Sequence, residues 1–147
     1  AYKHTIGKPF LQTVAMGEQH ARSFHIALDQ YVIEAGEREE LNCKEEGFNT
    51  KPYYFYFGSV PVSGTDPVLT VGEAILEVIR VRFSDPEKPA LAKVHWYHLT
   101  LESAKSLLAE INDFIIRETI SASQDSSQGH VNTFAVHLGL ADCVKGL

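Results

Sequence analysis

Five consecutive aromatic residues, Tyr53 to Phe57 in KPYYFYFGSV, constrain the fold more than any other stretch. Such a run can stack on nucleic-acid bases, line a ligand pocket, or form a strand that packs on both faces. Side chains alternate between the faces of a strand, so Tyr53, Phe55 and Phe57 share one face and Tyr54 and Tyr56 the other. The phenylalanine face suits a core beneath a helix. The tyrosine face suits an apolar surface whose hydroxyls stay hydrated or hydrogen-bonded.

The balance of charge bears on the base-stacking interpretation. The chain carries 13 Lys and Arg residues against 19 Asp and Glu residues, a net charge of -6. Nucleic-acid-binding proteins draw most of their affinity from basic side chains that neutralise phosphates. Only Lys51, Arg80 and Arg82 lie on or beside the aromatic strand and its predicted neighbour. We therefore expect no nucleic-acid partner.

The pattern around the aromatic run predicts an α+β domain with an antiparallel β-sheet. Stretches rich in β-branched and aromatic residues predict strands at about 52–62, 73–83 and 90–99, with a fourth candidate at 131–140. The polar turn SDPEKP joins the second and third of these strands, which indicates an antiparallel hairpin. Weak alternation from Pro9 to Met16 indicates a further short strand.

A long amphipathic helix over about 101–118 is the clearest single element. Thr100 can cap its N-terminus, and apolar residues recur at helical spacing from Leu101 to Ile115. We expect this helix to cover the sheet. A second helix is predicted over about 18–35, with a β-hairpin as the alternative because some of its apolar residues also alternate.

The 147 residues fit a single compact domain, 1–147. The polar stretch 38–51 predicts a loop before the aromatic strand. The segment 121–130, which contains SASQDSSQG, predicts a polar linker before the C-terminal segment.

The apolar face left over by one covering helix is the basis for a functional hypothesis. In the predicted strand 73–83, Leu76 and Val78 extend the apolar face that carries Tyr54 and Tyr56. One helix cannot cover both faces, so the second helix or another subunit must cover this one, because large apolar patches are unusual on monomers. We expect a non-catalytic binding or assembly domain that associates with a protein partner or with itself through this face.

A second hypothesis comes from a short motif. In VHWYHLTLES, His98 and Thr100 are two positions apart at a strand end. The motif resembles the His-x-Thr/Ser motif of the two-histidine phosphoesterases, in which two facing motifs supply general acid, general base and phosphate-binding hydroxyls. The resemblance implies a metal-independent phosphoesterase acting on a small phosphodiester. The second motif would be HIAL at His25 or HLGL at His137, and both lack the hydroxyl residue.

No cofactor or metal is expected. The chain has no GxxxxGK[ST], GxGxxG, GxSxG or HExxH motif. His95 and His98 face opposite ways on a strand, so zinc would require histidines from distant segments to converge.

The cysteines and the apolar runs bear on location. Cys43 and Cys143 are far apart and form no CxxC pair, which favours two free thiols in a reducing compartment over one long-range disulfide. No stretch approaches the roughly 18 apolar residues of a membrane span, and AYKHTIGKPF lacks the apolar core of a signal peptide. We expect a cytoplasmic protein with no membrane partner.

Overall fold

The structure is a computed structural model that describes residues 2–62, 70–124 and 129–144. The predicted α+β fold with an antiparallel sheet is confirmed. The elements in chain order are β1 (Tyr2–Thr5), β2 (Phe10–Gly17), α1 (Glu18–Glu45), β3 (Lys51–Pro61), α2 (Val71–Ser84), β4 (Leu91–Leu99), α3 (Leu101–Gln124) and β5 (Val131–Val144).

The long strand β5 organises the sheet. One of its edges pairs with β3, and its other edge pairs with β1 near one end and with β2 near the other. Strand β3 also pairs with β4, so β4 is at one side of the sheet and β1 and β2 are at the other. All of these pairs are antiparallel, so the strands predicted at 52–62, 90–99 and 131–140 belong to one sheet.

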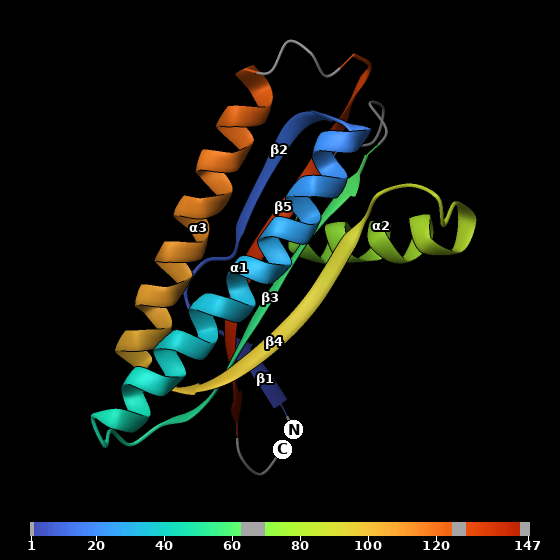
Figure 1. The fold of residues 1–147 in the computed structure, drawn as a ribbon. Coiled ribbons are helices and arrows are strands. Elements are labelled where there is room, and N and C mark those ends of the chain that lie inside the picture. The colour runs from blue at the N-terminus through green and yellow to red at the C-terminus, as the bar shows by residue number, and fades with distance from the viewer. Residues whose placement is uncertain (1, 63–69, 125–128, 145–147) are drawn as a thin grey trace.

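The two long helices α1 and α3 lie side by side on one face of the sheet, and α2 runs across the other (Figure 1). We call these faces the α1–α3 face and the α2 face. Tyr53, Phe55 and Phe57 are at most 2% exposed and belong to the main core, together with apolar residues of α1 and α3. Tyr54 and Tyr56 are half-buried on the α2 face. The predicted division of the aromatic run is therefore confirmed.

The prediction of a strand over 73–83 is wrong, because this segment lies within helix α2. Its Ile and Val residues favour β structure by propensity. However, the buried residues Ala74, Val78 and Val81 recur at helical spacing, which places them on one side of the helix. Thr70 caps the N-terminus, where its Oγ1 accepts a hydrogen bond of 3.1 Å from the Glu73 N–H.

The predicted hairpin between 73–83 and 90–99 is wrong for the same reason. Strand β4 pairs instead with β3, in a register that sets Tyr54 opposite Trp96 and Tyr56 opposite Val94. A short polar turn suggests a hairpin only if both flanking segments are strands. Here it joins a helix to a strand.

Helix α1 was predicted as 18–35 and continues to Glu45, so most of the predicted loop 38–51 is helical. Contacts with α3 explain the extension. Arg38 forms an ion pair with Glu110 at 2.5 Å, and the Ser103 hydroxyl donates to Glu39 at 3.1 Å. Polar residues that bridge two helices do not show the apolar spacing of a helix, so the predicted helix ended too early in the sequence.

Three further features of the fold differ from the prediction. Helix α3 was predicted as 101–118 and runs to Gln124, so residues 121–124 of the predicted linker 121–130 are helical, while 125–128 lie outside the described residues. The short strand β1 was not predicted. Helix α1 was a predicted cover for the face that carries Tyr54 and Tyr56, but it lies on the same face of the sheet as α3.

Candidate interaction surface

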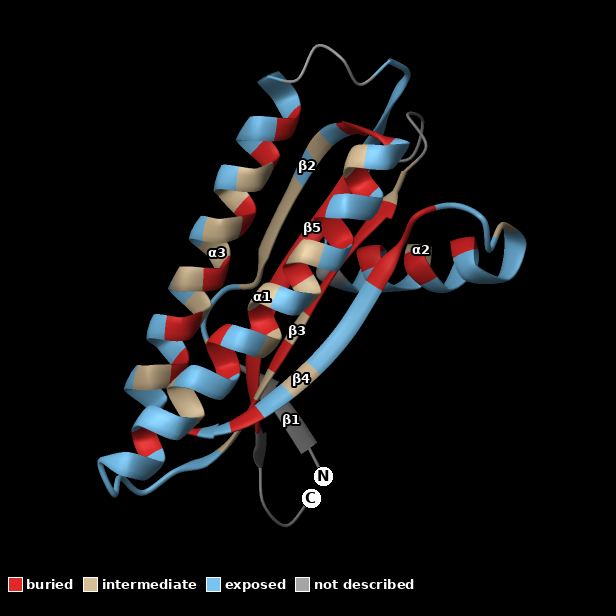
Figure 2. Cartoon of the chain, viewed as in Figure 1, coloured by how far each residue is buried: buried red, intermediate tan, exposed pale blue. Residues whose placement is uncertain are grey.

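Helix α2 covers only one end of its face of the sheet. Its buried residues Val78 and Val81 form a second, smaller core with Val60 of β3 and Ala135 of β5. Further along β3, the α2 face carries Tyr54 and Tyr56, and no other described helix lies on that face (Figure 1). Strand β4 is exposed along most of its length (Figure 2).

The uncovered part of the α2 face is aromatic. The sheet register places Tyr54, Trp96 and Val94 on this face, with His98 at one end. The Tyr54 and Trp96 ring centroids are 6.3 Å apart, and the Trp96 and His98 rings meet edge-to-face at 5.3 Å. Trp96 is 53% exposed and Val94 is 52% exposed. We call Tyr54, Tyr56, Val94, Trp96 and His98 the aromatic patch.

A glycine in the neighbouring strand allows the Tyr56 ring to lie close to the sheet. Gly139 of β5 pairs with Tyr56, and a Cβ at Gly139 would lie 2.0 Å from Cζ of the Tyr56 ring. The ring therefore rests directly on the β5 backbone. A side chain at this position would force Tyr56 away from the sheet.

Helix α2 adds an exposed apolar ridge on the same side of the molecule. At about 100° per residue, four apolar residues of α2 fall within one stripe, roughly opposite the buried residues. These residues, which we call the α2 ridge, are Ile75, Leu76, Ile79 and Phe83. Leu76 is 67% exposed and Phe83 is 88% exposed. The α2 ridge and the exposed patch residues Val94 and Trp96 are two groups of exposed apolar side chains on the α2 side of the sheet. Exposed apolar groups of this kind can mark interaction sites.

The structure places three of the four predicted interface residues at this surface. Tyr54 and Tyr56 lie in the aromatic patch, and Leu76 lies on the α2 ridge. Val78 is only 5% exposed and packs in the smaller core, because the helix turns it toward the sheet. Trp96 is the residue that sequence reasoning missed. Trp96 lies opposite Tyr54 because β3 pairs with β4, and the sequence did not predict this pairing.

The two residues of the His-x-Thr motif, His98 and Thr100, have different surroundings in the structure. Thr100 caps α3, as predicted, because its Oγ1 accepts a hydrogen bond of 3.1 Å from the Ser103 N–H. The His98 backbone N–H donates to Glu40 at 2.6 Å, and its ring is half exposed, with Nδ1 3.8 Å from the same carboxylate.

Neither candidate second histidine is brought to His98. His137 pairs with Gly58, which pairs in turn with Ala92, six positions before His98 in β4. That separation is about 20 Å along a strand. His25 lies beside Leu91, near the same far end of β4, on the α1–α3 face. The structure therefore places neither His25 nor His137 opposite His98.

His25 and His137 are instead buried and uncharged at neutral pH. Burial lowers the pKa of His25 to about 4, with the positive charges of Arg82 and Arg22 adding to the effect. Burial alone lowers the pKa of His137 to about 4. His25 Nε2 and His137 Nδ1 are enclosed and have no hydrogen-bond partner among the described residues. Both rings behave as core side chains that tolerate no proton at pH 7.

One titratable pair was not predicted. His95 Nε2 lies 2.7 Å from Asp29 Oδ1, and each side chain is 26% exposed. The pair borders a shallow depression of about 450 Å³, whose lining includes His25, Asp29 and Lys93. A carboxylate that orients an imidazole can support proton transfer. No Ser, Thr or Cys side chain in the described part of the chain hydrogen-bonds to His95, so the pair lacks a nucleophile.

Other functional classes gain no support from the geometry. Within residues 2–62, 70–124 and 129–144, no three His, Cys, Asp or Glu side chains are grouped to hold a metal ion. None of the described helices is long and apolar enough to cross a membrane. Cys43 is a free, buried thiol, as predicted, whereas the side chain of Cys143 lies outside the described part of the chain. The compartment stays a prediction.

Comparisons of this chain with protein-family models, with curated proteins and with solved structures found no match.

Proposed function

We propose that this protein is an assembly domain that associates with a second copy of itself through the aromatic patch and the α2 ridge. One observation carries the proposal. The aromatic patch and helix α2 lie on the same face of the sheet, and Val94, Trp96 and the residues of the α2 ridge are exposed. Tyr and Trp are the residues favoured at the centre of protein interfaces.

The shape of this surface suits a two-fold symmetric contact. In such a contact, the same patch is used by both copies, so each part must meet its complement on the partner. The α2 ridge of one copy can lie on the aromatic patch of the other, and the reverse contact follows from the symmetry. Each copy then covers the half of the α2 face that its own α2 leaves open.

The charges of α2 beside the α2 ridge do not oppose self-association, although the chain carries a net charge of -6. Arg80 of α2 forms an ion pair with Glu77, which cancels charge locally. Repulsion between more distant acidic groups is screened over about 8 Å at physiological salt.

A double substitution in the patch tests the proposal. Tyr54→Ser with Trp96→Ser removes two aromatic anchors, and anchors of this kind each contribute about 2 kcal/mol or more to binding. We expect the dimer dissociation constant, measured by sedimentation velocity, to rise at least about a hundredfold.

The matched control is Ile26→Ser. Ile26 is 69% exposed but lies on α1, on the other side of the sheet. It should leave the dissociation constant unchanged. Circular dichroism should show that all variants keep the fold. If the patch variant dimerises as well as the control does, the aromatic patch is not the contact surface.

A further inference from the structure

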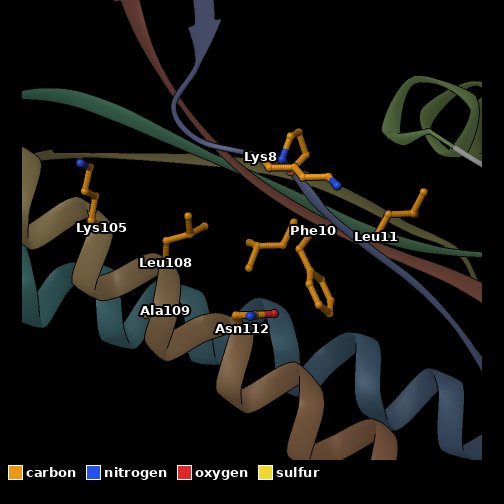
Figure 3. Close-up of a pocket in the computed structure, with 9 residues that line it drawn as sticks. Lys8, Phe10, Leu11, Lys105, Leu108, Ala109 and Asn112 are labelled. Carbon is orange, nitrogen blue, oxygen red and sulfur yellow. The ribbon is translucent and has the colours of Figure 1, made fainter.

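A pocket of about 460 Å³ lies on the α1–α3 face, between α3 and the start of β2. Figure 3 shows Leu108 and Asn112 of α3 facing Phe10 across the opening. A hydrogen bond of 3.0 Å from Gln12 to Thr119 joins β2 to α3 further along the helix. The volume falls within the range of small-molecule sites, and the walls are mainly apolar, as such sites usually are.

The charged groups that line this pocket are both positive. Lys8 comes from the turn before β2 and Lys105 from the first turns of α3 (Figure 3). Neither lysine forms an ion pair with any described residue, although the chain as a whole carries a charge of -6. In Figure 3 the two ammonium groups lie at opposite ends of the opening, and their flexible four-carbon stems would have to rotate inward for both to meet one anion.

The pocket also contains a buried polar atom without a partner. Asn112 Oδ1 is enclosed and accepts no hydrogen bond from the described residues. Enclosed polar side-chain atoms in folded proteins nearly always have a partner. A bound ligand with an N–H or O–H group would supply the missing donor.

We propose that this pocket binds a small amphipathic anion. Its apolar body lies between Leu108 and Phe10, its carboxylate or sulfonate meets Lys8 and Lys105, and its N–H or O–H donates to Asn112. The pocket is on the opposite face of the sheet from the aromatic patch. This proposal therefore does not depend on the dimer.

Two fluorescent probes with the same body test the proposal. 1-Anilinonaphthalene-8-sulfonate has a naphthalene body, an N–H donor and an anionic group, whereas N-phenyl-1-naphthylamine has the same body and N–H without the charge. We expect the native protein to bind the sulfonate roughly tenfold more tightly, with the difference shrinking as salt is added. Equal affinities for the two probes would overturn the assignment of the lysines.

Variants identify the site. Lys8→Gln with Lys105→Gln should bring the sulfonate to the affinity of the neutral probe and leave the neutral probe unchanged. Asn112→Leu should weaken both probes to a similar extent, and Leu108→Trp, which fills the pocket, should abolish both. Circular dichroism checks the fold of each variant. If the Tyr54→Ser, Trp96→Ser variant loses probe binding while the pocket variants retain it, the probes bind the aromatic patch and the proposal fails.

Discussion

Lowering the pH from 7.5 to 5 should reduce the free energy of unfolding by about 2 kcal/mol for each of the two buried histidines. In the folded protein the pKa values of His25 and His137 are both about 4, whereas an unfolded histidine titrates near 6.5. Above pH 6.5 neither state binds the proton, so the histidines have no effect. Between pH 6.5 and 4 only the unfolded state binds it, and stability falls as the pH falls.

Urea unfolding at several pH values measures this effect against matched variants. His25→Leu and His137→Leu should each remove about half of the excess pH dependence, whatever their effect on stability at pH 7.5. His130→Leu, which replaces an exposed histidine, should retain the pH dependence of the parent protein. Carboxylates also change the free energy of unfolding with pH in every variant. The effect of the histidines is therefore the difference between the slopes of the variants and that of the parent protein. Identical slopes in all four proteins would show that the buried histidines do not control acid stability.

Replacing Gly36 by Ala should destabilise the protein by about 2 kcal/mol, although Ala is the better helix former. A Cβ at Gly36 would lie 2.2 Å from the buried ring of Tyr97, whose hydroxyl donates to the Val32 carbonyl at 3.3 Å. The glycine allows α1 to approach β4 at this point. A methyl group would push the helix and the strand apart in a close-packed core.

The matched control for Gly36→Ala is Gly72→Ala in α2. The nearest atom to a Cβ at Gly72 is Thr70 Oγ1 at 3.9 Å, which is ordinary contact. This substitution should be neutral or stabilising by up to about 1 kcal/mol. Urea unfolding compares the two. A stabilised Gly36→Ala protein would mean that α1 and β4 are not in close contact there.

The parts of the fold that follow a local period were predictable from the sequence. Alternation in the aromatic run placed Phe55 in the core and Tyr54 on the opposite face, and the apolar spacing after Thr100 gave α3. The prediction for the α2 segment was wrong because Ile and Val favour strands by propensity. Its helical form depends on packing against Val60 and Ala135, which are distant in sequence.

The candidate surface was only partly predictable, because it depends on strand pairing. Tyr54 and Tyr56 were identified from alternation alone. Trp96 became part of the patch through the pairing of β3 with β4, across an intervening helix that was predicted as a strand. The close approach of the Tyr56 ring to Gly139 and the contact of Asp29 with His95 also join segments that are distant in the sequence, so no local pattern predicts them.

Sedimentation velocity of the unmodified protein, from micromolar to near-millimolar concentration, tests the central claim most directly. We expect a reversible monomer–dimer equilibrium, with a dimer that becomes dominant as the concentration rises. A protein that stays monomeric over the whole range would contradict self-association through the aromatic patch and the α2 ridge.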